Sequence, residues 1–274
     1  MMLVAFDFGI SNTDIAIFQD NKTTFHSIPS EHTSISPKLI KTVLDIFSLS
    51  LSEISLIGVT GGKSSDLPEN IDLIPIIKIN EVDAIGFGAK VLYNIAEEPT
   101  LVISAGTGTA CVMVQGNNFN HLGGIAVGGG MLEGLGSLLF KNAQGQEINE
   151  FATQGSRDKL DLLIGDVVNK IGALSPEITA VNFGKAKIAS ADSMENTSAA
   201  LCNMVGEVIG TIAYLNALLI GSSRVCFLGR TSYLSEVNKG IDERLQLAGI
   251  SGQYNDDREY GNVIGVIEQL KNHG

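Results

Sequence analysis

Two short turns in the sequence carry residues that could bind a phosphate group. Asp7 closes an apolar stretch and is followed by Gly9, Ser11 and Asn12, and residues 105–109 read Ala-Gly-Thr-Gly-Thr after a second apolar stretch. A tight turn of glycines and small hydroxyl residues presents backbone N–H groups to an anion, and a carboxylate beside it can hold Mg²⁺. The first turn alone could be an ordinary hairpin, but its repetition favours two phosphate-binding turns.

A third glycine segment, residues 123–136, is the densest in the chain. It contains Gly128, Gly129 and Gly130 directly before a helical pattern that begins at Met131. Consecutive glycines let the backbone approach a ligand closely and aim a helix N-terminus at an anion. The chain has neither a Walker P-loop nor a strand-Gly-x-Gly-x-x-Gly-helix unit, which argues against Walker-type ATPases and dinucleotide-dependent dehydrogenases.

Two carboxylates begin the helix that we predict over residues 80–96. Glu81 and Asp83 follow a strand predicted over residues 73–79 and therefore lie at its carboxyl edge. One of them could take the proton from an attacking hydroxyl group. Acidic residues in a first helical turn are also favoured by the helix dipole, whatever their function, so spacing alone leaves both interpretations open.

The elements that must position these residues follow a pattern that occurs twice. The first set has predicted strands at 3–8, 14–19 and 23–28, a helix at 37–49, and a strand at 54–60 that ends in Thr60-Gly61-Gly62. The second set has predicted strands at 100–104, 109–115, 118–122 and 224–228, with helices at 131–172, 197–219, 233–246 and 261–271. A three-stranded meander, a helix and a further strand are typical of the ribonuclease-H-like half of actin-like ATPases.

The repeat predicts an α/β protein with two ribonuclease-H-like lobes, residues 1–80 and residues 81–274. A nucleotide is expected in the cleft between the lobes, because both phosphate-sized turns would face that cleft. The second lobe would also carry the long apolar helix.

The composition limits the kinds of partner. Of 274 residues, 44% are hydrophobic and 18% charged, and the formal net charge is −12 without any basic run, so nucleic acid is not an expected partner. Cys111, Cys202 and Cys226 lie singly in apolar stretches and predict buried thiols in a reducing cytoplasm. We expect no export signal and no membrane span, since the apolar stretch 209–220 is shorter than the roughly 20 residues that cross a bilayer.

Six motifs, taken in order, resemble the type II pantothenate kinases of bacteria and eukaryotes. They are Thr60-Gly61-Gly62, Glu81-Val82-Asp83-Ala84, Gly106-Thr107-Gly108-Thr109, Gly128-Gly129-Gly130-Met131, Phe151–Arg157 and Val181-Asn182-Phe183-Gly184. The resemblance runs from the first strand to Gly265. It implies a homodimer, built on the helix around residues 205–219, that phosphorylates pantothenate with Mg²⁺ and ATP in the first step of coenzyme A synthesis.

The resemblance also implies a role for each matching residue. Glu81 would be the catalytic base, Asp7 would hold Mg²⁺, and the acceptor would contact Glu81, Asp83, His121 and Arg157. The implied nucleotide contacts are Asp7, Gly9, Ser11, Asn12, Thr107, Gly108, Gly128, Gly129, Gly130, Met131, Gly229 and Arg230, and the turn Gly229-Arg230-Thr231 would lie near the adenine side.

Two positions depart from the family pattern. Asp14 stands where the bacterial family has a lysine, and His121 stands where it has an arginine that helps to hold the substrate. An imidazole cannot replace a guanidinium as a bidentate anion ligand. Arg157, Lys63 or Lys78 could supply the missing charge, or the acceptor could differ, because pantothenate carries a carboxylate and pantetheine does not. A kinase for pantetheine or an amino sugar, and an inactive ATP-binding regulator, therefore stay open as alternatives.

Overall fold

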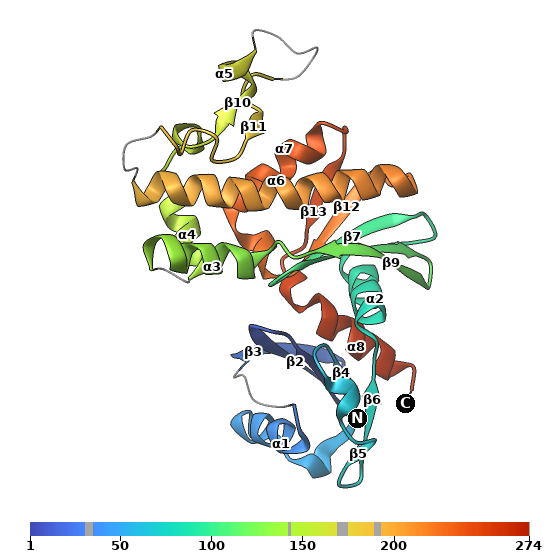
Figure 1. The fold of residues 1–274 in the computed structure, drawn as a ribbon. Coiled ribbons are helices and arrows are strands. Elements are labelled where there is room, and N and C mark those ends of the chain that lie inside the picture. The colour runs from blue at the N-terminus through green and yellow to red at the C-terminus, as the bar shows by residue number, and fades with distance from the viewer. Residues whose placement is uncertain (31–34, 142–143, 169–174, 189–192, 274) are drawn as a thin grey trace.

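The computed structural model describes residues 1–30, 35–141, 144–168, 175–188 and 193–273, which form two lobes (Figure 1). The N-terminal lobe contains β1 (Met2–Phe8), β2 (Asn12–Gln19), β3 (Lys22–Pro29), α1 (Pro37–Ile46), β4 (Ile54–Thr60), β5 (Asn70–Ile71) and β6 (Ile74–Lys78). Its sheet has the order β3-β2-β1-β4-β6-β5. The first three strands are antiparallel, whereas β4 pairs parallel to β1 and β6 parallel to β4.

The second lobe repeats this topology. Its sheet has the order β13-β12-β7-β8-β9, with β7, β8 and β9 antiparallel and β12 and β13 added in parallel. The strands are β7 (Thr100–Ala105), β8 (Thr109–Gln115), β9 (Asn118–Ile125), β12 (Arg224–Leu228) and β13 (Ser251–Tyr254). The helices are α2 (Glu81–Tyr93), α3 (Gly129–Phe140), α4 (Gly145–Ala152), α5 (Ile164–Val167), α6 (Met194–Ile220), α7 (Ser235–Gln246) and α8 (Gly261–Lys271). A small two-stranded sheet pairs β10 (Leu162–Leu163) with β11 (Thr179–Val181).

The local sequence explains the position of the elements in each sheet. β1 is apolar along nearly its whole length and lies in the middle of its sheet, where both faces are covered. β3 alternates exposed and half-buried residues and lies at the edge. Helix α1 begins where the Ser36 side chain accepts a hydrogen bond from the Leu39 amide, and it buries Ile40, Val43 and Leu44 against the sheet.

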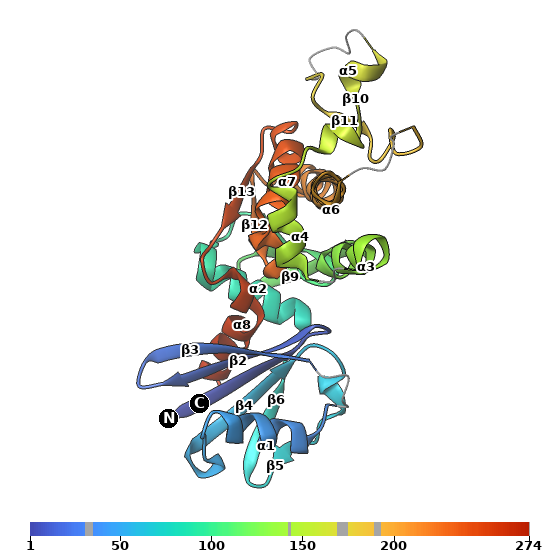
Figure 2. The same ribbon diagram turned by 90° about the vertical axis from the view of Figure 1, so that its left-hand side faces the viewer.

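Two helices pack across the lobe boundary (Figure 2). α2 follows the N-terminal sheet in the chain but packs on the second sheet, where Ile85 and Ala89 meet Val102 and Val112. α8 ends the chain and packs on the N-terminal sheet, where Val266 and its neighbours meet Leu3 and Ala5 of β1. The predicted division at residue 80 stays a prediction, and α8, which it assigned to the second lobe, covers the first.

Helix α6 forms the main layer over the second sheet. Its buried residues include Val205, Ile209 and Ala213, which belong to the core cluster of that lobe. By length and composition this helix could cross a membrane, but 44% of its most apolar window is buried inside the protein. The buried residues form the face that packs in the core of the second lobe.

The region predicted as helical over residues 131–172 is divided into several elements. α3 ends at Phe140, and the C-cap residue Lys141 adopts a left-handed conformation with φ of 61°, which terminates the helix. β10 and α5 follow, and residues 142–143 and 169–172 lie outside the described residues. The short strands β5, β11 and β13 were not predicted, because segments such as Ser251–Tyr254 are too short and too polar to show an apolar pattern.

Candidate active site

A cleft of about 990 Å³ lies between the two lobes. Both lobes supply its walls: the turns after β1 and β4 come from the first, and the turns after β7 and β12 come from the second. The N-terminal ends of α2, α3 and α8 also open onto it. Helix N-termini bring the positive end of the helix dipole to the cleft, and glycine turns let a ligand approach the backbone closely, which is the environment that an anion requires.

Most of the predicted site residues line this one cleft. They are Asp7, Gly9, Ser11, Asn12, Glu81, Thr107, Gly108, His121, Gly129, Gly130, Gly229 and Arg230. Glu81 is the first residue of α2, and the Asn80 side chain caps that helix by accepting a hydrogen bond from the Val82 amide at 2.8 Å. His121 lies on β9, where the register with β8 shifts by a bulge beside Val112. The structure therefore brings the helix-start carboxylate, the histidine and both glycine turns together.

Four predicted site residues do not line the cleft: Gly128, Met131, Asp83 and Arg157. Gly128 is buried, and a Cβ atom at this position would lie 2.7 Å from the Gly106 carbonyl oxygen. Its missing side chain lets the start of α3 pack against the turn after β7. Met131 packs against the core of the second lobe.

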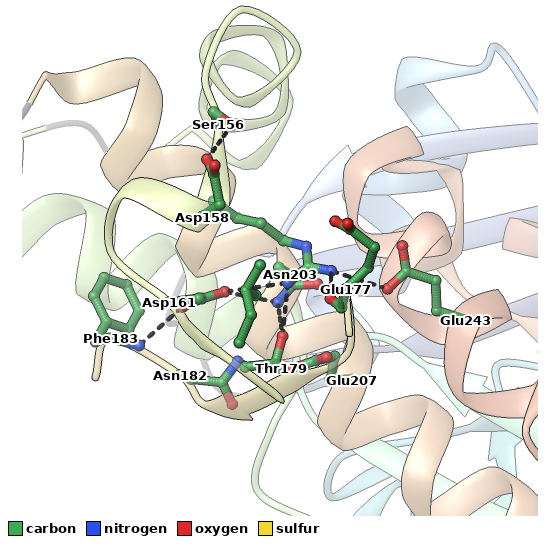
Figure 3. A network of polar contacts seen from close by, with 12 residues as sticks. Ser156, Asp158, Asp161, Glu177, Thr179, Asn182, Phe183, Asn203, Glu207 and Glu243 are labelled. Carbon is green, nitrogen blue, oxygen red and sulfur yellow. Dashed lines mark hydrogen bonds and ion pairs between the residues drawn. The ribbon is translucent and has the colours of Figure 1, made fainter. Parts of the chain in front are cut away.

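Arg157 lies in a second cavity of about 200 Å³, between α4, α6 and α7. Its guanidinium donates to the Thr179 hydroxyl at 2.7 Å and to the Glu177 carbonyl oxygen at 2.9 Å. Figure 3 shows this network, in which the buried Asn203 amide also bonds Asp161 at 2.9 Å. Arg157 therefore orders the segment around β11 in this structure.

Neither of the lysines considered as substitutes for the missing arginine lines the cleft. Lys63 and Lys78 both lie in the described part of the first lobe, and Lys78 pairs with Glu69 at 2.7 Å. The described residues of the cleft wall thus offer two arginines and one histidine as cationic groups: Arg230, Arg258 and His121.

Thr231 has a bridging role that the sequence did not reveal. Its buried hydroxyl group donates to the Gly106 carbonyl oxygen at 2.7 Å and accepts from the Gly129 amide at 3.0 Å. One side chain therefore joins the turn after β12 to both glycine segments of the second lobe. Its neighbour Gly229 has φ of 87°, a conformation that glycine adopts without strain.

Asp7 is held by the C-terminal helix, which the sequence also did not indicate. The Asn262 amide group donates to Asp7 Oδ2 at 2.9 Å. Burial raises the pKa of Asp7 to about 7, although the hydrogen bond from Asn262 opposes this rise. An asparagine at a helix start would have been interpreted from sequence as a capping residue.

The other oxygen of Asp7 fits a magnesium ion. Gly61 leaves room beside it, because a Cβ atom on Gly61 would lie 2.3 Å from Asp7 Oδ1. Among the described residues, no group of three or more His, Cys, Asp or Glu side chains could hold a metal ion by itself. Mg²⁺ commonly takes one or two protein carboxylates and completes its shell with phosphate oxygens and water, so a single open carboxylate oxygen suits it.

Asp14 is not a free negative charge in the cleft. Its buried carboxylate receives two hydrogen bonds from Arg230, at 2.9 and 2.6 Å, and Arg230 belongs to the opposite lobe. The Arg230 Nε atom also lies 3.0 Å from Glu259. The acidic departure from the family pattern is therefore neutralised by an arginine that lies 216 positions later in the chain.

Comparisons with known proteins agree with this geometry. The sequence pattern of the family described as Fumble matches residues 18–239. This chain belongs to the Fumble family. A type II pantothenate kinase of Oceanobacillus iheyensis is 32% identical over 186 residues, which cover 66% of this chain and 69% of that protein. A type II pantothenate kinase of Staphylococcus aureus is 26% identical over 276 aligned residues, which cover 97% of this chain and 98% of its own length. The predicted family is confirmed.

Solved structures establish the fold of this Fumble-family chain. An activator of 2-hydroxyisocaproyl-CoA dehydratase from Clostridium difficile, with bound ADPNP, matches with a TM-score of 0.67 and 15% identity over 100% of this chain and 97% of its own. A ROK family glucokinase from Streptomyces griseus, in complex with glucose and AMPPNP, matches with a TM-score of 0.57 and 12% identity over 100% of both chains. The predicted two-lobed actin-like ATPase fold is confirmed.

Proposed function

We propose that this chain is a kinase that transfers the γ-phosphate of ATP to the primary hydroxyl group of pantothenate, the first step of coenzyme A synthesis. The observation that carries the proposal is one cleft in which the helix-start carboxylate Glu81 meets a glycine turn from each lobe. Membership of the Fumble family and the type II pantothenate kinases among its relatives support the choice of acceptor.

Different residues of the cleft would bind the phosphates and activate the acceptor hydroxyl. Backbone N–H groups of the two turns, near Gly9 and Gly108, would bind the phosphates, the α3 start at Gly129 would add the positive end of its helix dipole, and Gly229 and Arg230 would lie on the nucleotide side as well. Glu81 would orient the acceptor hydroxyl and remove its proton as the phosphoryl group arrives. The proposed site leaves out Asp83 and Arg157, which do not line the cleft.

Mg²⁺ would bind at the open Oδ1 atom of Asp7 beside Gly61. When bound, it supplies positive charge to the phosphate oxygens. Asn262 keeps the Asp7 carboxylate oriented through the bond to Oδ2.

We further propose that the enzyme is a cytoplasmic homodimer. On α6, three large apolar side chains of the last turns are exposed: Leu215 at 50%, Leu218 at 58% and Leu219 at 76%. A second copy could cover this surface, because obligate dimer interfaces are apolar. The three cysteines are buried thiols without disulfide bonds, as expected for a reducing compartment.

Pantetheine is the second candidate acceptor, for a specific reason. Of the three cationic groups on the described cleft wall, Arg230 is bound to carboxylates, and Arg258 is engaged by Ser232 and the Asn255 carbonyl. Only His121 remains for the carboxylate of pantothenate, and an imidazole cannot bind a carboxylate in the bidentate manner of a guanidinium. A neutral acceptor would not need this group.

The test is ATP consumption with Mg²⁺ and either pantothenate or pantetheine, for the unaltered protein, Glu81→Gln and the matched control Glu53→Gln. Glu53 is an exposed carboxylate in the first lobe, outside the cleft. We expect turnover with pantothenate, a loss of about 10²- to 10⁴-fold in kcat for Glu81→Gln, and no change for Glu53→Gln. Turnover with pantetheine alone would show that pantetheine, and not pantothenate, is the acceptor. ATP binding without turnover on either acceptor would indicate a regulator.

A further inference from the structure

Two carboxylates face each other across the first hairpin of the cleft. Asp7 of β1 and Asp14 of β2 are paired directly in the antiparallel register. Like charges at directly opposed positions destabilise a sheet unless each finds a partner of its own. Asp7 has the Asn262 amide group, and Asp14 has the Arg230 guanidinium, so the pair depends on groups from elsewhere in the fold.

The backbone of Arg230 lies in the second lobe, beside the glycine turns, whereas Asp14 lies in the first lobe. Arg230 follows Gly229 and precedes Thr231, whose hydroxyl group contacts both Gly106 and Gly129. From there the side chain reaches Asp14, and its charge also acts on the neighbouring Asp7. The Arg230 side chain is 33% exposed and lines the cleft, so a ligand bound there can reach it.

The other arginine of the cleft wall cannot play this part. Arg258 is 8% exposed and donates to the Ser232 hydroxyl at 2.8 Å, the Ser232 carbonyl at 2.9 Å and the Asn255 carbonyl at 2.7 Å. Its guanidinium also lies 3.5 Å from the centre of the Tyr233 ring. These contacts fix Arg258 inside the second lobe.

The cleft therefore has a marked imbalance of charge among its described residues. Its carboxylates are Asp7, Asp14, Glu81, Glu133 and Glu259, and its arginines are the buried Arg258 and the partly exposed Arg230, which pairs with Asp14 and Glu259. A nucleoside triphosphate is a strong polyanion, and the planar fork of a guanidinium binds phosphate in the same bidentate manner as carboxylate.

We propose that Asp14 holds Arg230 in the nucleotide-free cleft and that the triphosphate of ATP displaces Asp14 from it. Asp14 thereby competes with the nucleotide and lowers its affinity, and the exchange breaks a contact between the lobes each time ATP binds. The inference rests on the proposed function only in taking ATP as the ligand. It assigns Arg230 to the phosphates, whereas the family resemblance implied the adenine side.

The test measures the dissociation constant of Mg·ATP by equilibrium titration, with no acceptor present. Arg230→Met should weaken binding by about 10- to 100-fold, the value of one or two charge-assisted hydrogen bonds. Asp14→Asn should tighten binding by about 3- to 10-fold, since it removes the competing charge.

Two further variants keep the result interpretable. Asp72→Asn removes an exposed carboxylate that pairs with Lys41 outside the cleft, and it should leave the affinity unchanged. Ser27→Ala removes the hydroxyl that accepts a hydrogen bond from Arg230 at 3.1 Å without altering any charge. It should tighten ATP binding by about 2-fold even if Asp14→Asn fails to fold.

Three results would overturn the inference. Weaker ATP binding by Asp14→Asn or by Ser27→Ala would mean that the pair belongs to the ATP-bound state. Unchanged binding by Arg230→Met would mean that Arg230 does not meet the nucleotide. Failure of the unaltered protein to bind ATP would contradict both this inference and the proposed function. If the protein binds ATP but shows no turnover, the proposed function fails, and the binding titration still tests the role of Arg230.

Discussion

Two regions join the lobes, and they differ in what makes the contact. At the helix crossing, α2 meets α8 backbone to backbone: a Cβ atom on Gly88 would lie 1.8 Å from the Gly261 carbonyl, and one on Gly265 would lie 1.9 Å from the Ala84 carbonyl. At the cleft mouth, polar side chains meet instead. The Ser11 and Thr107 hydroxyl groups lie 3.0 Å apart, and Asp14 pairs with Arg230.

The difference shows which contact can change during function. Backbone surfaces packed without side chains have no rotamers with which to adapt, so the helix crossing holds one geometry. The exposed Ser11–Thr107 hydrogen bond exchanges with water or a ligand at little net cost in free energy, whereas the Asp14–Arg230 pair, whose carboxylate is buried, opens when an anionic ligand replaces Asp14 as the partner of Arg230. We therefore expect the lobes to move about the helix crossing while the contacts of the cleft mouth break and form again.

The largest effect is expected at the helix crossing. Gly88→Val would drive a branched side chain into the Gly261 backbone and separate α2 from α8. We expect a loss of at least about 3 kcal/mol in the free energy of unfolding, as for other overpacked cores. Urea unfolding, followed by circular dichroism, measures it.

A glycine in an open position provides the control for that substitution. Gly134 lies in α3, and a Cβ atom there would meet no other atom within 4 Å. Gly134→Ala should be neutral or stabilise by up to about 1 kcal/mol, through helix propensity. Equal stability of Gly88→Val and the unaltered protein would show that the helix crossing adapts.

A buried polar contact within one lobe should have the next largest effect. Thr231→Val removes the two hydrogen bonds that the hydroxyl makes with Gly106 and Gly129 and leaves only the direct bond from the Gly129 amide to the Gly106 carbonyl, at 2.9 Å, between these segments. We expect a loss of about 2 kcal/mol in stability and weaker binding of ATP. Thr231→Ser, which keeps the hydroxyl group, should retain most of the stability and of the ATP binding. A similar loss in the two variants would show that packing of the Thr231 methyl group, rather than its hydrogen bonds, is responsible.

A smaller, pH-dependent effect is expected where α8 reaches into the cleft at Asp7. Burial raises the pKa of Asp7 in the folded protein from 3.8 to about 7, so between these pH values the folded state binds more protons than the unfolded state. Stability from this group is therefore greatest at low pH and declines as the pH rises towards 7. Asp7→Asn should remove that decline and stabilise the protein at pH 8 by on the order of 1 to 2 kcal/mol, given about 1.4 kcal/mol per pKa unit and partial hydration of the open cleft.

Unfolding of both proteins at pH 5 and pH 8, without Mg²⁺, checks this prediction. The stability difference between Asp7→Asn and the unaltered protein should increase with pH. A constant difference would show that the Asp7 carboxylate is ionised at both pH values.

The smallest effect on stability is expected at the cleft mouth. Ser11→Ala removes an exposed hydroxyl group whose partner, Thr107, belongs to the other lobe. The free energy of unfolding should change by less than about 0.5 kcal/mol. A destabilisation as large as that of Thr231→Val would abolish the distinction between a fixed helix crossing and an adjustable mouth.

The fold was largely predictable, because its signals are local and repeated. The apolar run of β1 and the spacing of Ile40, Val43 and Leu44 on α1 specify a strand and a helix by their periods. The division of residues 131–172 was missed, since Lys141 gives no sequence signal for its left-handed conformation. β13 was missed because its pairing with β12, rather than its own composition, makes it a strand.

The candidate site was predictable where short motifs carry it. The glycine turns and Glu81 stand out as local patterns, and the structure places them in one cleft. Thr231 and Asn262 carry no such signal, because their partners Gly106 and Asp7 lie 125 and 255 positions away. Arg157 resembled a site residue in sequence, but it orders the segment around Thr179.

By itself, the sequence determined the repeated strand pattern, the phosphate-sized turns and the family, since these depend on residue types at short spacing. Tertiary structure decided which charges meet. It placed α8 on the first lobe, so that Asn262 reaches Asp7, and it opposed Asp14 to Arg230 across the cleft. Electrostatic partners depend on distance in space, and only the folding of both lobes around α2 and α8 sets that distance.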